Sequence, residues 1–190
     1  LRAVRHAGNN PDIPFAVFKP TAFGNNKALE MLSGSAEADQ KIVQEGERFR
    51  SRIDQLCQTA FDHDIPILVD AEDTFYQNFI DRVVIEMMRK YNHGKAIVFN
   101  TYQMYRHDRI EVLKADIETA RKEKFYLGAK FVRGAYMERE RERAGPLLPA
   151  ANREHPHPPE SGAGTGAGTG MAPSNIGVSV LMSLPNLAIR

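Results

Sequence analysis

Four short apolar runs recur along the first part of the chain, and they limit the folds that it can adopt. They cover residues 15–18, 67–69, 96–99 and 128–132. Each run is too short for a helix, and its apolar residues are nearly continuous rather than alternating, which is typical of strands covered on both faces. The sequence therefore predicts a parallel sheet.

Helical patterns separate these runs. Apolar residues recur every three or four positions over residues 36–62, 74–91 and 108–124, and a further helix is expected between Tyr136 and Ala144. Successive strand ends at Asp70, Asn100 and Val132 are about 30 residues apart, roughly the length of one βα unit. We predict an α/β fold, a partial (βα)8 TIM-type barrel of about four βα units, in preference to an open doubly wound sheet.

The composition changes after residue 144. Residues 145–190 hold half of the 14 glycines and most of the 11 prolines, but no aromatic residue. A segment of this kind buries too little apolar surface to offset the entropy lost on ordering. We expect a foldable part over residues 1–144 and a disordered Gly/Pro-rich tail over residues 145–190, with no defined element in 176–189.

Charge and cysteine content exclude several classes of protein. The net charge of +1 argues against nucleic-acid binding. The single cysteine, Cys57, excludes an intramolecular disulfide framework and is consistent with a reducing compartment. No apolar run is long enough to span a bilayer. The first residue is Leu and no signal-like segment follows, so we interpret the start as internal to a longer protein.

Polar side chains stand at the end of each predicted strand. Lys19, Asp70, Asn100 and Arg133 follow the apolar runs directly, and Lys130 lies on the same face of the last run as Val132. In a β/α barrel the carboxyl ends of the strands form the active-site face, so these groups are expected to converge. The alternative is that polar residues end these strands only because loops are solvated.

Lys19 and Asp70 are expected on neighbouring strands, where each favours the charged form of the other. Such a pair can orient a zwitterionic substrate or a polar ring. The acidic residues Asp70, Glu72 and Asp73 lack metal-ligand spacing, so no metal is expected. A glycine-rich match at residues 162–167 follows no strand, which argues against dinucleotide binding there.

The residues after Arg133 have two interpretations. Gly134 and Ala135 are small enough for a flat ligand to approach the backbone, and Tyr136 supplies an aromatic face with a hydroxyl group. The same residues also suit a turn at the start of a helix, with a tyrosine that only packs. The residues alone leave both interpretations open.

Four motifs at the strand ends resemble one family. FKPTA (residues 18–22), VDAE (69–72), VFNTYQ (98–103) and KFVRGAY (130–136) are similar, in order and spacing, to segments of the proline dehydrogenase family. Members of this family are FAD enzymes that begin proline catabolism. The resemblance covers about residues 13–144 and implies the N-terminal half of a catalytic β/α barrel.

The resemblance implies a reaction and its partners. L-Proline would be oxidised to 1-pyrroline-5-carboxylate, a step toward glutamate biosynthesis from proline, with non-covalently bound FAD as cofactor and a quinone as electron acceptor. The protein would be cytoplasmic and peripheral at the inner membrane, which is the mitochondrial inner membrane in a eukaryote. No nucleic-acid partner is expected.

The resemblance also implies roles for individual residues. A fixed positive charge near the flavin ring stabilises the negative charge that the ring gains on reduction. Lys19 and Asp70 would form an ion-paired active-site couple. The implied catalytic residues are Lys19, Asp70, Lys130 and Tyr136, and the implied cofactor-binding residues are Asn100, Gln103, Lys130, Val132, Gly134 and Ala135.

The resemblance stops after Ala144. The other half of the barrel would have to come from the full-length protein, including the paired arginines that bind the proline carboxylate in the family. We expect weak or no activity from this chain alone, and interpret it as an incomplete gene product with a tail out of register with the parental reading frame. Two alternatives are a barrel aldolase that forms a Schiff base through Lys19 or Lys130, and a non-catalytic barrel fragment that pairs with another chain.

Overall fold

The centre of the protein is a sheet of four parallel strands with a fifth strand at one edge. The computed structural model describes residues 1–34, 38–133 and 180–184. The sheet order is β1-β2-β3-β4-β5. The first four strands are parallel neighbours, and β5 is antiparallel to β4. The strands are β1 (Ala16–Phe18), β2 (Ile67–Val69), β3 (Val98–Gln103), β4 (Leu127–Val132) and β5 (Val180–Leu184).

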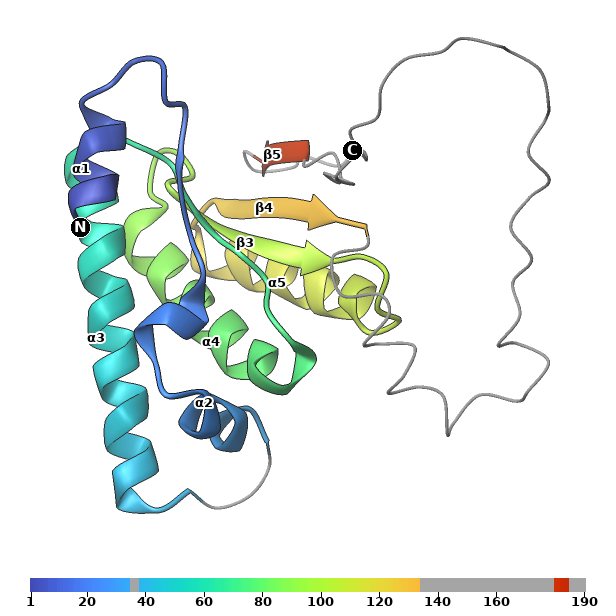
Figure 1. The fold of residues 1–190 in the computed structure, drawn as a ribbon. Coiled ribbons are helices and arrows are strands. Elements are labelled where there is room, and N and C mark those ends of the chain that lie inside the picture. Colours follow the sequence, from blue (N-terminus) through green and yellow to red (C-terminus); the bar gives the residue numbers. More distant parts are fainter. Residues whose placement is uncertain (35–37, 134–179, 185–190) are drawn as a thin grey trace, which may run out of the picture.

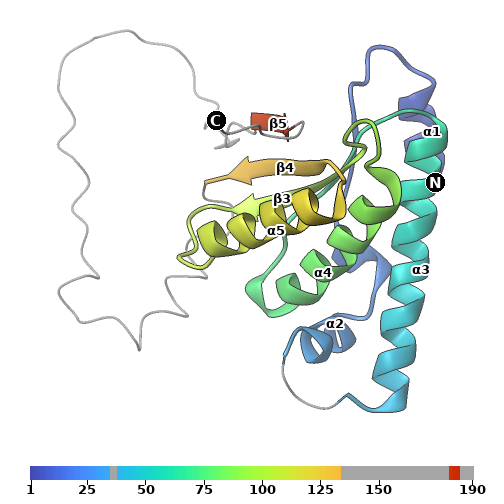
Figure 2. The same ribbon diagram turned by 180° about the vertical axis from the view of Figure 1, so that it is seen from behind.

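Helices connect the parallel strands and cover one face of the sheet. Figures 1 and 2, which show opposite sides of the molecule, place α4 and α5 against the same face of β3 and β4. This arrangement, with strands in chain order, is that of successive βα units in a barrel. The helices are α1 (Arg2–Gly8), the 3-10 helix η1 (Pro20–Phe23), α2 (Asn26–Ser33), α3 (Gln40–Asp62), α4 (Thr74–Tyr91) and α5 (Arg109–Glu123).

The main hydrophobic core lies between the helices and the sheet. Every second residue of the strands faces this core, because side chains of a strand alternate between its two faces. Ile67, Val69 and Val98 contribute from the strands, while Phe49 of α3 and Phe79 of α4 pack against each other with ring centroids 5.7 Å apart. The core therefore holds β2 and β3 in a fixed register, with the strand ends at one edge.

The predicted helices are confirmed closely, and the first βα interval contains an element that was missed. The pattern over residues 74–91 corresponds to α4, and 108–124 to α5. Residues 26–33 form α2, for which no helix was predicted. The available signal was Asn25, whose side chain accepts a hydrogen bond from the amide of Ala28 at 3.1 Å and so caps the helix.

The third strand differs from its prediction. The apolar run at 96–99 predicted a strand that ends at Phe99, whereas β3 runs from Val98 to Gln103. Its polar half is buried and hydrogen-bonded to neighbouring elements, so tertiary contacts compensate for the cost of burying it. Strand length was therefore underestimated because apolar character was the only criterion.

The tail contains one element that the sequence did not predict. No defined element was expected in residues 176–189, but residues Val180–Leu184 form β5. A strand edge with unpaired backbone groups attracts any segment that can pair with it, and local composition does not reveal such an edge. The other tail residues, and the helix expected between Tyr136 and Ala144, lie outside the described residues.

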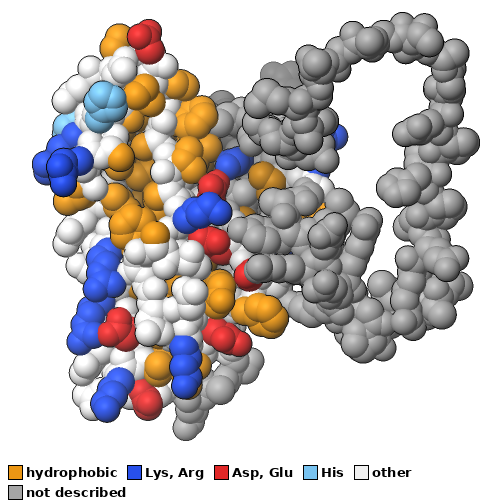
Figure 3. Space-filling model, viewed as in Figure 1, with side chains coloured by type: hydrophobic (Ala, Val, Ile, Leu, Met, Phe, Trp, Pro, Cys, Tyr) orange, Lys and Arg blue, Asp and Glu red, His pale blue; other side chains and the backbone are white. Residues whose placement is uncertain are grey.

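Strand β1 forms the opposite edge of the described sheet. Val17 of β1 keeps 47% of its surface accessible, although it is apolar. Figure 3 shows hydrophobic side chains gathered on the upper part of one face of the molecule, while lysine and arginine side chains are more frequent along the lower left. β1 is thus the open end of the described sheet.

Candidate active site

Asp70 and Lys130 form an ion pair at the carboxyl ends of the parallel strands. The Lys130 Nζ atom donates a hydrogen bond to Asp70 Oδ1 at 2.6 Å. Asp70 follows β2, Lys130 belongs to β4, and β3 lies between them. The two side chains are 26% and 13% exposed, so solvent screens the pair only partly. A charged pair at this edge lies where barrel enzymes hold their substrates.

The register of the sheet explains this pairing. Val69 pairs with Asn100, and Thr101 pairs with Lys130, so Asp70, Thr101 and Lys130 lie in one row across three strands. Thr101 is short, and its hydroxyl donates to the carbonyl of Val69 at 2.7 Å. The long Lys130 side chain can therefore pass over Thr101 to reach Asp70.

The predicted ion pair between Lys19 and Asp70 is wrong. Among the described residues, Asp70 pairs with Lys130. β1 and β2 are neighbours, as predicted. However, β1 ends at Phe18, and Lys19 is an exposed N-cap residue of η1, where Pro20 turns the chain. Lys130 takes the position beside Asp70 instead.

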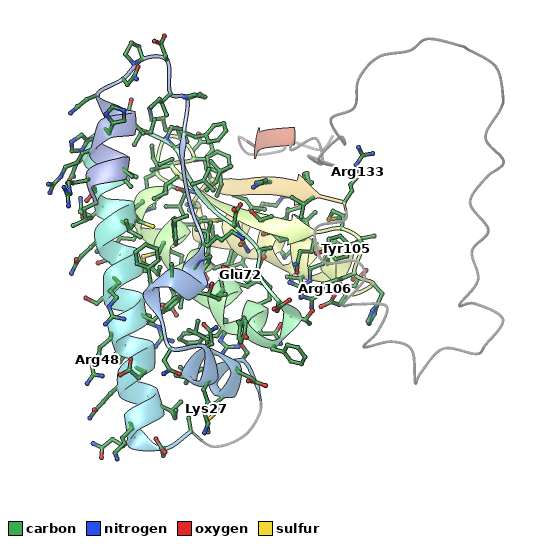
Figure 4. All side chains as sticks on the ribbon, in the orientation of Figure 1. Lys27, Arg48, Glu72, Tyr105, Arg106 and Arg133 are labelled. Carbon is green, nitrogen blue, oxygen red and sulfur yellow. The ribbon has the colours of Figure 1, made fainter. Side chains whose placement is uncertain are left out.

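A second group of contacts joins three of the four motifs. The Thr21 hydroxyl donates to Glu72 Oε1 at 2.7 Å. The Gln103 side-chain amide donates to the backbone carbonyl of Glu72 at 2.9 Å, and its oxygen accepts a hydrogen bond from Arg106 Nη1 at 3.2 Å. Glu72 is buried between these groups, and Figure 4 labels Glu72 and Arg106 on this part of the molecule. Sequence reasoning did not single out Thr21, Glu72 or Arg106, although Thr21 and Glu72 stand inside the motifs.

Asn100 lies on the other face of β3. Asn100 is two residues after Val98, so its side chain lies on the same, core-facing side of the strand. Its side-chain amide donates a hydrogen bond to Asp81 Oδ1 of α4 at 2.9 Å. Asn100 is 1% exposed. The structure therefore brings Asp70 and Lys130 together but directs Asn100 toward the helices. Contact between Asn100 and a flavin stays a prediction.

The remaining candidates are placed as follows. Val132, at the end of β4, is half-buried, and Arg133 after it is exposed. Arg133 is labelled in Figure 4, where it points away from the sheet. Gly134, Ala135 and Tyr136 lie outside the described residues.

A buried ionic network supports the strand ends from the helix side. Arg109 Nη1 donates to Asp81 Oδ2 at 2.7 Å, and both Arg106 and Arg109 pair with Asp108. Partial burial raises the pKa of Asp108, but the hydrogen bonds from Arg109 and Arg106 outweigh this effect and lower it to about 2. Asp108 therefore stays ionised and fixes the loop between β3 and α5.

Asp116 is a carboxyl group whose pKa is raised by its surroundings. It lines a cavity of about 490 Å³ between α4 and α5, together with Asp81 and Arg109. Burial raises the pKa of Asp116 to about 6, and the nearby Asp81 charge also raises it, against a lowering effect of the hydrogen bond from the Tyr102 hydroxyl. Ionisation of this carboxyl group therefore costs more free energy in the folded protein than in the unfolded chain.

Replacing Asp116 with Asn is expected to stabilise the protein more at about pH 8 than at about pH 4.5. The folded pKa is higher than the unfolded value, so the carboxyl group favours folding at low pH, and this contribution is lost as pH rises through 6. After discounting for solvent screening, the gain is about 1–2 kcal/mol. Urea unfolding at both pH values measures it, with Glu118→Gln on the exposed face of α5 as control. An equal change at both pH values would contradict this interpretation.

Neither a metal cluster nor a membrane span is found in the described part of the chain. Residues 1–34, 38–133 and 180–184 contain no group of three or more His, Cys, Asp or Glu side chains that is placed to hold a metal ion. In the same residues, no helix combines the length and the hydropathy needed to cross a bilayer.

Comparison with known proteins decides the family. A sequence model of the proline dehydrogenase family matches residues 5–147. The chain belongs to the proline dehydrogenase family. The match includes the four motifs, so the resemblance and the α/β barrel class predicted from the sequence are confirmed.

Relatives of this proline dehydrogenase family member are considerably longer. Proline dehydrogenase 1, mitochondrial, from Drosophila melanogaster is 50% identical over 106 residues, which cover 54% of this chain and 16% of the relative. The Dictyostelium discoideum protein of the same name is 36% identical over 158 residues, covering 77% of this chain and 28% of the relative. The chain thus spans less than a third of the length of these relatives.

Solved structures support the same fold. A structure of proline utilization A with proline bound in remote sites matches with a TM-score of 0.61 and 22% identity. The match covers 75% of this chain and 14% of that one. At this identity the comparison shows the fold alone, a part of a β/α barrel. The comparisons give no support to the barrel aldolase alternative.

Proposed function

We propose that this chain supplies the N-terminal half of a proline-oxidising site. In the proposed reaction, the ring carbon of L-proline beside the nitrogen loses a hydride and the nitrogen loses a proton, which gives 1-pyrroline-5-carboxylate. FAD, when bound, supplies the hydride acceptor, and a quinone takes the two electrons afterwards. The Asp70–Lys130 ion pair at the carboxyl edge of the parallel strands, inside the region that matches the family, carries this proposal.

The residues at this edge fit a flavin ring. Lys130 offers a positive charge that is largely buried and fixed in direction by Asp70. Fixed positive charge stabilises negative charge that develops in a low-dielectric site, and its orientation costs nothing during the reaction. Val132, two residues further on β4, supplies an apolar surface beside it. Lys130 and Val132 would therefore hold the cofactor from this half of the barrel.

The other candidates have supporting parts in this proposal. Exposed Lys19 can attract a substrate carboxylate from the end of β1. Gln103 is held by Glu72 and Arg106, so it fixes the strand end rather than moving freely toward a ligand. Asn100 would support the site indirectly, because its hydrogen bond to Asp81 ties β3 to α4 on the helix side of the sheet. Tyr136, Gly134 and Ala135 complete the proposed site.

The chain alone is expected to have weak or no activity. The described residues contribute four parallel strands, half the number in an eight-stranded barrel, and the site of such a barrel draws on the ends of all its strands. Purified 190-residue chain should show no turnover above background when L-proline, FAD and a soluble quinone are supplied. Turnover at the rate of an intact relative would contradict the view that this chain holds only half of the site.

A chimera tests the proposed function directly. Residues 1–133 of this chain would be joined to the remaining barrel and C-terminal part of the Drosophila relative. If this half supports the reaction, the chimera should reduce a soluble quinone in the presence of L-proline but not of D-proline. A folded, flavin-loaded chimera without L-proline-dependent quinone reduction would contradict the proposal. The same assay with trans-4-hydroxy-L-proline measures the preference between the two substrates.

The proposed location follows from the relatives. Two of them are named as mitochondrial proteins, and a quinone acceptor resides in a membrane. We therefore propose a mitochondrial protein that touches the inner membrane peripherally. Fractionation of mitochondria expressing the chimera should release it with alkaline carbonate, which removes peripheral proteins.

A further inference from the structure

Strand β5 lies where a continuing barrel would place a different strand. β1 to β4 are parallel and in chain order, so a closed barrel requires another parallel strand beside β4. In this chain that edge is taken by β5, which runs antiparallel. β5 pairs with five of the six residues of β4, from Leu127 opposite Leu184 to Phe131 opposite Val180. The edge of β4 is thus filled, but not in the way that extends the barrel.

The edge beneath β5 favours association when it is uncovered. Leu127 and Ala129 of β4 are buried, and Phe131 and Val132 at its end are of residue types that favour strands. A row of unpaired backbone groups along such a strand is a template for pairing with another chain. Figure 1 shows β5 beside β4, on the side away from β3.

The opposite edge of the sheet offers a complementary surface. The amide of Ala16 donates to the Pro66 carbonyl at 2.8 Å, and the carbonyl of Phe18 accepts from the Asp70 amide at 3.0 Å. Successive residues of a strand direct their backbone groups to opposite sides, so Val17 directs its amide and carbonyl away from β2. Its exposed side chain lies on the same open edge. No described strand pairs with this side of β1.

We propose that the edges of β4 and β1 are complementary interaction surfaces for a second copy of this chain, and that β5 blocks the β4 edge in the monomer. Placing β4 of one copy beside β1 of the next continues the parallel order. The described residues of two copies supply eight parallel strands, the number in a closed β/α barrel. Because the contact is heterologous and repeats after a half-turn, it closes into a dimer and not into a filament. This proposal is independent of the proposed oxidation of proline.

Breaking β5 tests the proposal. Met182 is the central residue of β5, opposite Ala129, and Met182→Pro removes a backbone donor there. The wild-type chain should be a monomer by light scattering after size exclusion. M182P should be a dimer at micromolar concentration, with faster amide exchange at Ala129 when the sample is diluted to the monomer. Thr165→Pro, elsewhere in the tail, is the control and should stay monomeric.

A second substitution locates the partner surface. Val17→Pro leaves the bonds between β1 and β2 in place, since proline is tolerated on an edge strand whose amide faces solvent. The double variant V17P/M182P should therefore return to a monomer. A monomeric M182P, large polydisperse aggregates, or a double variant that remains dimeric would each overturn the proposal. Deletion of residues 174–190 repeats the test. Loss of the helical circular dichroism signal in both M182P and the deletion would show that β5 is an integral part of the fold. That result would also overturn the proposal.

Discussion

Asn92→Ala is expected to lower the free energy of unfolding by about 4 kcal/mol, the largest stability effect that we anticipate for a single polar side chain. Asn92 is fully buried between the end of α4 and β3. Its amide nitrogen donates to the carbonyls of Val98 and Tyr126, and its oxygen accepts from the amides of Ile97 and Val98. Alanine leaves these backbone groups buried without partners, and each such group costs about 1–3 kcal/mol.

Urea unfolding followed by circular dichroism measures this effect. Asn78→Ala, on the exposed side of α4, is the matched control and should change stability by less than about 0.5 kcal/mol. Asn92→Asp keeps an oxygen acceptor but loses the two donated bonds, so it should also destabilise. A loss of less than about 1 kcal/mol in N92A would show that water or a shifted backbone replaces the lost bonds.

Lys130→Met in the chimera is expected to lower kcat/KM for proline by about 100-fold or more. The substitution keeps an unbranched side chain, one atom shorter, and removes its charge. A single preorganised group that stabilises developing charge contributes about 10²–10³ in rate. Asp70→Asn should also reduce activity, because it leaves the Lys130 charge without its partner at 2.6 Å. The double variant should lose less than the product of the two single losses, since the residues act as a unit.

A surface pair provides the control for this experiment. Lys114 pairs with Glu111 at 2.8 Å on α5, and both side chains are largely exposed. Lys114→Met removes the same charge from a solvated position and should leave kcat/KM unchanged. Thermal unfolding of all variants excludes loss of fold as the cause. Near-normal turnover of K130M would remove Lys130 from the reaction.

The order and type of the main elements could be predicted because each has a local signal. Continuous apolar runs indicate buried parallel strands, and the apolar stripe of residues 74–91 indicates a helix of that length, as α4 is. β5 lacked a comparable signal, and α2 was missed because it is short. α2 begins at an Asn-Asn pair that is equally typical of a turn, and β5 depends on an edge contributed by residues about fifty positions earlier.

The partners at the candidate site could not be predicted for a related reason. Sequence spacing placed Lys19, Asp70 and Lys130 at one edge of the sheet, and the pair predicted there was Lys19 with Asp70, because their strands are neighbours. The structure pairs Asp70 with Lys130 instead. Register decides between the two lysines, because Lys130 lies in the same row as Asp70 while the chain turns into η1 at Lys19. Glu72 was overlooked because a buried carboxylate is recognisable only once its donor, Thr21, is placed beside it.

Anaerobic addition of L-proline to the flavin-loaded chimera tests the central claim most directly, because it isolates the oxidation of proline from the quinone and the membrane. If residues 1–133 supply a working half of the site, the visible absorption of the flavin should bleach with L-proline, and the bleaching should be at least about 100-fold slower with K130M. A folded chimera that stays yellow with saturating proline, or bleaches equally fast with and without Lys130, would contradict the account.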